Sequence, residues 1–273
     1  MSVTNLNSVN LDSPTTVPEE QIKQFRKEGH TLTRGLLSRD EAALCREVIV
    51  DAADRYNTEK RKLEDRDTYG KAFLQIMNLW KNDAEVKKFV LAKRFGSVAA
   101  QLLGVKNVRI YHDQALFKEA GGGPTPWHQD QYYWPIDTPN TITMWMPLVD
   151  IDIDMGMLTF ASGSHTKGRI FNHEISDESE AEFAKYVADN NFEVTRASTM
   201  KAGDATWHYG FTIHNAPGNK SNTRREVMTI IYLADGAKVT EPQNSWQVND
   251  RKNWLMDWPV GEEVGSELNP KVL

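Results

Sequence analysis

The sequence predicts a mainly β domain with flanking helices, in which a helical N-terminal layer precedes a set of short strands. Three observations support this prediction. Residues 19–104 carry apolar side chains at helical spacing. After Gly104, short β-rich segments alternate with glycine and proline turns, as in a sandwich or barrel. The 273 residues show no internal repeat and no central linker, so we expect residues 19–273 to form one domain.

The first 18 residues are rich in Ser, Thr, Asn, Val and Pro. They have few large apolar side chains and no period, so burial would not offset the entropy lost on ordering them. We therefore expect residues 1–18 to be a flexible leader. They also lack the basic segment and the apolar segment of a signal peptide.

The helical layer is predicted from apolar spacing and from capping residues. Glu19–Lys27 is expected to be a short helix. Ser38 and Glu41 form an S-x-x-E capping box, which indicates the start of a second helix. Asn82–Leu103 is expected to be helical, divided at Gly96 and ended by Gly104.

Residues 57–80 have no assignment from their pattern. Because long irregular stretches are often functional, we expect residues 69–80 and the glycine-rich residues 121–124 to act as lids.

The second half of the chain is predicted to supply the sheets. Its β-rich segments are residues 105–119, 141–153, 156–161, 202–206 and 226–233. Turn signals separate them at residues 121–124, 137–140, 163–164 and 216–219. One helix is expected to interrupt the strands at Ser176–Asn190.

Composition excludes several classes of protein. The net charge is −6, which gives no support for a nucleic-acid partner. No run of ~20 apolar residues is present, so we expect no membrane span. Cys45 is the single cysteine, which excludes an internal disulfide and a thiolate zinc cluster. We therefore expect a cytoplasmic protein that acts on a small molecule. The sequence gives no oligomeric state.

Three residues are candidate metal ligands. In a strand, residues i and i+2 face the same side, so His128 and Asp130 in the W-H-Q-D segment aim together. His214 follows later, at the end of a β-rich run. Two histidines and a carboxylate are the ligands of non-haem Fe(II) oxygenases. Each residue taken alone is more often an ordinary packed or surface side chain, and His208 is the main rival for the third position.

Arg225 is a candidate anion-binding residue. Arginine offers a bidentate fork to a carboxylate, and Arg225 follows His214 closely. Its neighbour Arg224 would point to the opposite face of a strand. The alternative for either arginine is a solvated charge on a strand.

The order and spacing of these motifs resemble the phytanoyl-CoA dioxygenase-like family of Fe(II)/2-oxoglutarate-dependent oxygenases. The resemblance rests on Trp127–Asp130, Gly156–His165, Gly203-Asp204, His214 and Arg225, and it runs from about residue 20 to the C-terminal region. It implies a double-stranded β-helix, the cupin-like jelly roll. It implies that His128, Asp130 and His214 bind iron and that Arg225 pairs with the distal carboxylate of 2-oxoglutarate.

The resemblance implies further roles around the metal. Thr143 would hydrogen-bond the co-substrate, Gln114 would turn its amide toward it, and Trp145 would line the iron pocket. The alternative for each is a packed strand residue. Tyr132 and Trp134 closely follow Asp130, and we expect them to line the substrate pocket, since ligand sites are mostly apolar.

The activity that the resemblance implies uses Fe(II), 2-oxoglutarate and O₂. It would hydroxylate an unactivated C–H bond of a small-molecule metabolite and release succinate and CO₂. Asp130 stands where halogenating relatives carry a small residue, which points away from halogenation. The alternative is a jelly-roll module that binds metal without catalysis or without 2-oxoglutarate. Desaturation and ring formation stay open, as does the substrate, although the negative net charge does not favour a CoA thioester.

Overall fold

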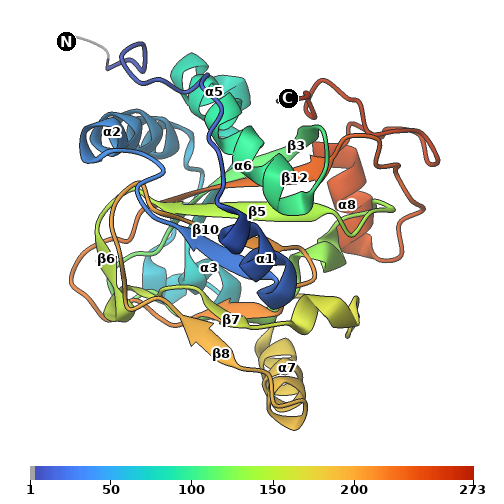
Figure 1. Cartoon of the computed structure of the whole chain (residues 1–273). Coiled ribbons are helices and arrows are strands. Elements are labelled where there is room, and N and C mark those ends of the chain that lie inside the picture. The colour runs from blue at the N-terminus through green and yellow to red at the C-terminus, as the bar shows by residue number, and fades with distance from the viewer. Residues whose placement is uncertain (1–3) are drawn as a thin grey trace.

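Two antiparallel sheets form the centre of the protein in the computed structural model, which describes residues 4–273 (Figure 1). The larger sheet has the order β1 (His30–Thr33), β10 (Ala205–Tyr209), β5 (Thr141–Pro147), β12 (Val227–Ala234), β3 (Val108–Phe117) and β2 (Leu74–Met77). The smaller sheet has the order β4 (Thr125–His128), β11 (His214–Ala216), β7 (Thr159–Ala161) and β8 (Val194–Arg196). A separate pair joins β6 (Ile151–Asp152) to β9 (Thr199–Met200). The predicted mainly β, jelly-roll class is confirmed.

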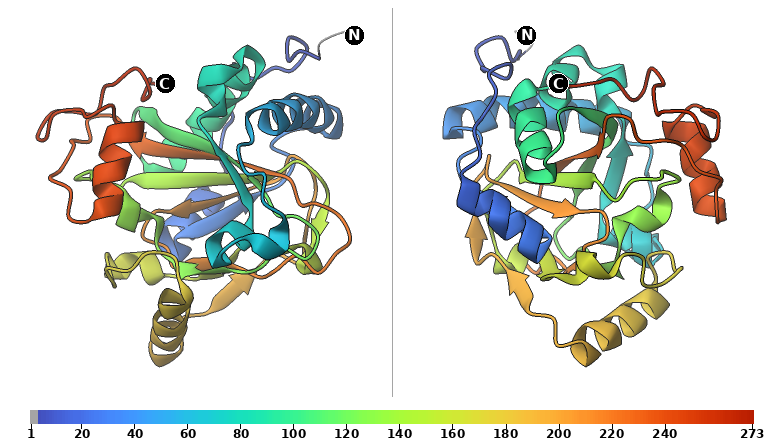
Figure 2. Two further views of the ribbon diagram at one scale, coloured as in Figure 1. Left: turned by 180° about the vertical axis from the view of Figure 1, so that it is seen from behind. Right: turned by 45° about the vertical axis from the view of Figure 1, so that its right-hand side comes forward.

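Helices cover one face of the larger sheet, as the views from two further sides also show (Figure 2). They are α1 (Glu19–Glu28), α2 (Arg39–Tyr56), α4 (Leu79–Asn82), α5 (Ala84–Val90) and α6 (Lys93–Leu103). The main apolar core lies between them and the sheet, where Phe95 of α6, Met144 of β5 and Ile230 of β12 are fully buried. Because side chains alternate across a strand, the opposite face of the same sheet remains for a cavity.

The predicted helix boundaries hold where a capping residue marks them. Ser38 and Glu41 form the expected capping box at the start of α2, and Gly104 ends α6 with a φ of 73°. The predicted break at Gly96 is wrong. The chain divides at residues 91–92 instead, and Gly96 lies inside α6, where an added Cβ would lie 2.6 Å from Val272. Close packing, not a helix end, requires this glycine.

The unassigned segment 57–80 belongs in part to the sheet. It forms η1 (Leu63–Asp65), α3 (Thr68–Ala72), β2 and the start of α4. β2 pairs with β3 over four residues, so this part of the expected lid is an edge strand. The predicted helix near 176–190 is α7 (Asp177–Asp189), and the C-terminal region adds α8 (Ser245–Trp254), which the sequence pattern did not predict.

A bulge in β3 decides which of its side chains reach the cavity. His112 pairs with Ile231 and Ile110 pairs with Tyr232, so Tyr111 is an extra residue in β3. Before the bulge, Val108 and Ile110 face the helical layer. After it, His112, Gln114 and Leu116 line the cavity on the other face.

The expectation of a flexible leader is contradicted for residues 4–18, while residues 1–3 lie outside the described part. Leu6, Leu11 and Val17 are buried in the same core as α2 and α6. The backbone N–H of Leu6 donates to Glu85 Oε2 at 2.7 Å, and that of Val17 donates to Gln101 Oε1 at 3.0 Å. These apolar residues enter separate gaps between helices, so they follow no helical or strand period.

No helix within residues 4–273 is long and apolar enough to cross a membrane.

We predict that Leu6→Ala lowers the free energy of unfolding by about 2–5 kcal/mol, because it removes a fully packed side chain from the core. Urea unfolding measures this change. Val260→Ala, at an exposed position, is the control and should change stability by less than about 0.5 kcal/mol. An equally small effect of Leu6→Ala would mean that the segment does not contribute to the core.

Candidate metal centre

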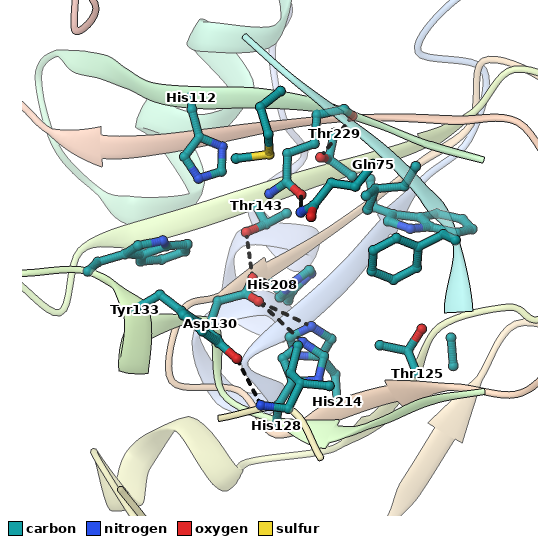
Figure 3. Close-up of a pocket in the computed structure, with 18 of the residues that line it drawn as sticks. Gln75, His112, Thr125, His128, Asp130, Tyr133, Thr143, His208, His214 and Thr229 are labelled. Carbon is teal, nitrogen blue, oxygen red and sulfur yellow. Dashed lines mark hydrogen bonds and ion pairs between the residues drawn. The ribbon is translucent and has the colours of Figure 1, made fainter. Parts of the chain in front are cut away.

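Three side chains converge at the edge of the smaller sheet (Figure 3). His128 ends β4 and His214 begins β11, and the two residues are direct partners in the antiparallel register. Gln129 keeps an extended backbone, with φ −121° and ψ 124°, so the alternation of the strand continues to Asp130. One ligand atom from each of His128, Asp130 and His214 lies within 4.8 Å of the others.

Hydrogen bonds on the far side of each imidazole fix the tautomers. His128 Nδ1 lies 2.7 Å from the carbonyl of Pro126, and His214 Nδ1 lies 2.9 Å from that of Thr212. A carbonyl only accepts, so each Nδ1 carries the proton and each Nε2 presents a lone pair. Those Nε2 atoms lie 3.4 Å and 3.6 Å from Asp130 Oδ1. Two imidazole Nε2 atoms and one carboxylate oxygen thus fit a divalent transition-metal ion.

The electrostatics favour the same protonation states. Burial, with the neighbouring imidazoles of His128 and His208, holds the pKa of His214 well below its ordinary value. Burial alone would raise the pKa of Asp130. The histidines around the carboxyl outweigh burial and hold that pKa well below its usual range. At neutral pH, Asp130 is therefore an anionic donor and His214 a neutral one.

The second oxygen of Asp130 is held by the larger sheet. Thr143 Oγ1 on β5 donates to Asp130 Oδ2 at 3.0 Å, and His208 Nε2 on β10 lies 3.2 Å from the same oxygen. His208, the alternative third ligand in the sequence analysis, thus lies near the candidate ligands. It contacts Oδ2 of Asp130, whereas Oδ1 of Asp130 faces His128 and His214. Thr143 is expected from the sequence to contact the co-substrate. In the structure its hydroxyl donates to this carboxylate.

The donor cluster opens into a cavity of about 230 Å³ between the two sheets. Six other residues singled out from the sequence line it, namely Gln114, Trp134, Thr143, Trp145, His208 and Arg225. Gln114 Oε1 accepts a hydrogen bond from Gln75 Nε2 on β2 at 2.6 Å, so the amide oxygen of Gln114 is already hydrogen-bonded.

Arg225 is a buried cation on the wall of this cavity. It is 2% exposed, its Nη1 donates to the carbonyl of Gly156, and its Nε has no partner among the described residues. The guanidinium carbon lies 5.2 Å from the centre of the Trp145 ring. No acidic side chain within residues 4–273 pairs with it, and burial lowers the pKa of Arg225 to about 9. Such a group is stabilised by a bound anion.

The two aromatic residues expected in the substrate pocket separate. Trp134 lines the cavity, whereas Tyr132 lies outside its lining and contributes to a shallow hollow near Glu174. Residues 130–133 form η2 (Asp130–Tyr133), a 3₁₀ turn with about three residues per turn. Tyr133, not Tyr132, therefore shares the side of Asp130 and lines the cavity.

Several lining residues were missed from the sequence. His112 depends on the bulge in β3, which no sequence pattern announced. Asn249, Asp250 and Trp254 come from α8. Trp246, Asp250 and Trp254 stand four residues apart, as one helical face requires, and this spacing was the available signal.

The fold is a jelly roll, and two histidines and an aspartate lie together at the rim of its smaller sheet. These features define a class, the cupin-like proteins, here with a candidate metal centre. Residues 16–227 match the phytanoyl-CoA dioxygenase (PhyH) family. The chain belongs to this family, as its motifs indicated.

Named relatives agree with this placement. The chain is 24% identical over 234 residues to the probable alpha-ketoglutarate-dependent hypophosphite dioxygenase of Stutzerimonas stutzeri, covering 80% of this chain and 79% of that protein. It is 24% identical over 268 residues to a phytanoyl-CoA dioxygenase domain-containing protein 1 homolog of Dictyostelium discoideum, covering 84% and 95%.

Solved structures share the fold. The non-heme alpha ketoglutarate dependent carbocyclase SnoK from nogalamycin biosynthesis superposes with a TM-score of 0.77 at 22% identity, covering 96% of this chain and 100% of that one. EctD from S. alaskensis, solved with 2-oxoglutarate and 5-hydroxyectoine, superposes with a TM-score of 0.67 at 17% identity, covering 97% and 92%.

We predict that Thr143→Val weakens the binding of Fe(II), or of Mn(II) as its substitute, by about 10- to 100-fold, because Asp130 loses a donor that orients it. Calorimetric titration of the metal-free protein measures this affinity. Thr229→Val, on the neighbouring strand of the same cavity, is the matched control. Equal affinity in the two variants would show that the Thr143 hydrogen bond does not orient the ligand.

Proposed function

We propose that the protein is an Fe(II)- and 2-oxoglutarate-dependent dioxygenase that hydroxylates a C–H bond of a small molecule. One observation carries the proposal. A single cavity joins a His-Asp-His donor cluster to a buried guanidinium that has no carboxylate partner among the described residues. A 2-oxo dicarboxylate fits both ends, because its oxo acid chelates a metal and its distal carboxylate needs a cation.

In this proposal the chain supplies binding and orientation. His128, Asp130 and His214 hold the metal, while Thr143 and His208 hold the aspartate in place. When bound, iron, 2-oxoglutarate and O₂ supply the oxidising chemistry, and succinate and CO₂ leave as products.

Arg225 is proposed to orient the co-substrate through its distal carboxylate. Its guanidinium is fixed by the carbonyl of Gly156 and by the face of Trp145, so little freedom is lost on binding. Gln114 and Trp145 line the same wall and would contact the co-substrate there.

The rest of the cavity is proposed to exclude water and bind substrate. Phe73, Tyr133 and Trp134 line it, and an apolar surround strengthens the charge interactions inside.

Hydroxylation is the proposed outcome, although the similar structures include enzymes described as a carbocyclase and an epimerase.

Cys45 is a buried free thiol, which supports a reducing, cytoplasmic setting.

We predict that the purified protein, given Fe(II), ascorbate and air, releases succinate slowly from 2-oxoglutarate without added substrate. His128→Ala should abolish this release, because it removes a metal ligand, and omission of iron should do the same. His173→Ala, which alters a surface histidine paired with Glu182, should retain it. Failure to bind either Fe(II) or 2-oxoglutarate would contradict the proposal and favour a non-catalytic module.

We predict that Arg225→Met raises the KM for 2-oxoglutarate by about 10- to 100-fold, the effect expected for loss of a charge-assisted hydrogen bond of about 1.5–3 kcal/mol. The matched control is Arg224→Met. Arg224 points away from the cavity and pairs with Asp54 and Glu226. The Arg224→Met variant should therefore keep the wild-type KM for 2-oxoglutarate. An unchanged KM in Arg225→Met would remove this residue from the co-substrate site.

A further inference from the structure

One polar side chain in the cavity has no part in the proposed metal and co-substrate sites. His112 projects from β3 into the cavity, above Thr143 and well away from Thr125 (Figure 3). It is 3% exposed, and its Nδ1 has no hydrogen-bond partner within residues 4–273. The ring of Tyr111 lies 5.1 Å away and that of Trp254 lies 5.7 Å away, centre to centre. An unpartnered imidazole in such a place is destabilising unless a ligand completes it.

The charge state of His112 limits what it can bind. Burial lowers the pKa of His112 to about 3, and the distant Asp130 carboxylate offsets this only in part. The imidazole is therefore neutral at neutral pH and offers one N–H donor and one acceptor nitrogen. A hydroxyl or a carbonyl satisfies such a group, whereas a carboxylate or phosphate requires a cation.

The surroundings of His112 supply no cation. Arg225 is the only lysine or arginine that lines the cavity among the described residues, and it is held at the wall beside Trp145 and Gly156. Asp250, the acid that α8 contributes to the cavity lining, already accepts a hydrogen bond from Tyr111 Oη at 2.9 Å. Burial raises the pKa of Asp250 to about 7, and the hydrogen bonds from Tyr111 and Trp254 offset part of that rise.

Helix α8 closes this end of the cavity and is fixed in place. Gln247 Nε2 donates to the carbonyl of Tyr132 at 2.9 Å. Asn269 Nδ2 donates to the carbonyls of Tyr111 and Trp254, each at 3.1 Å. The helix is thereby tied to β3 by buried polar contacts, so its cavity-lining face is a preformed wall.

We infer that His112 is a specificity-determining residue that hydrogen-bonds an uncharged hydroxyl or carbonyl group of the substrate, whose apolar part packs against Tyr133, Trp134 and Trp254. The inference rests on the proposed function, because it names the substrate class for the same cavity. It selects a neutral, partly apolar molecule over acyl phosphates, CoA thioesters and free acids.

Four probes with one carbon skeleton test the inference, namely cyclohexanol, cyclohexanone, cyclohexylamine and cyclohexanecarboxylate. Saturation-transfer NMR and quenching of tryptophan fluorescence, to which Trp134 and Trp254 contribute, measure their binding to the full chain. We expect the alcohol and ketone to bind more tightly than the ammonium and the carboxylate. His112→Phe should weaken binding of the alcohol by about 2- to 10-fold, the effect of one lost hydrogen bond, and reduce its preference over the charged probes by the same factor.

Two variants keep this test decisive. His173→Phe should bind all four probes as the wild type does. If His112→Phe does not fold, as judged by circular dichroism, His112→Gln replaces it and should keep part of the preference for the alcohol, since its amide also donates and accepts.

Three results would overturn the inference. The first is equal affinity for cyclohexanol in the wild type and in His112→Phe. The second is tighter binding of cyclohexylamine than of cyclohexanol, which would make Asp250 and the aromatic rings a cation site. The third is no binding of the alcohol or the ketone. The probes need no turnover, so a wild type that binds cyclohexanol but binds neither Fe(II) nor 2-oxoglutarate would refute the proposed function alone.

Discussion

The contacts of Asp130 are the interaction on which the rest of the site depends. Its Oδ1 faces His128 and His214 from the smaller sheet, and its Oδ2 is held by Thr143 and His208 from the larger one. One partly buried carboxylate thus joins the two sheets at the point where they enclose the cavity. An anion withdrawn from water requires such partners, so the spacing of the sheets and the geometry of the candidate metal ligands are determined together.

The cavity is electrically asymmetric. Near Arg225 lies Lys118, whose Nζ donates to the carbonyl of Gly123, and burial with the nearby guanidinium lowers the pKa of Lys118 to about 6. No carboxylate among the described residues pairs with either group. Around His112 the polar groups are neutral or already hydrogen-bonded. One side is therefore suited to a carboxylate and the other to an uncharged group, which would orient two ligands without competition between them.

Sequence reasoning located the donors because their positions depend on local rules. Strand alternation relates His128 to Asp130, and the capping box of Ser38 marks a helix start. It failed where tertiary packing overrides such rules. A 3₁₀ turn places Tyr133, not Tyr132, in the cavity. The apolar residues of the N-terminal segment insert singly between helices, so no period reveals their burial. The position of α8 at the cavity depends on buried contacts with β3, which lies far away in the sequence, so local rules do not predict it.

The extra residue in β3 has a consequence for how this scaffold can diversify. Because Tyr111 shifts the alternation of the strand, the even-numbered residues of β3 pack in the core before it and line the cavity after it. Loss of one residue there would exchange the β3 side chains that face the cavity, while β4 and β11, which carry the candidate histidine ligands, stay in register. The cavity-lining residues of β3 and the two candidate histidine ligands thus lie on separate strands, and a one-residue insertion or deletion can alter the first without rebuilding the second.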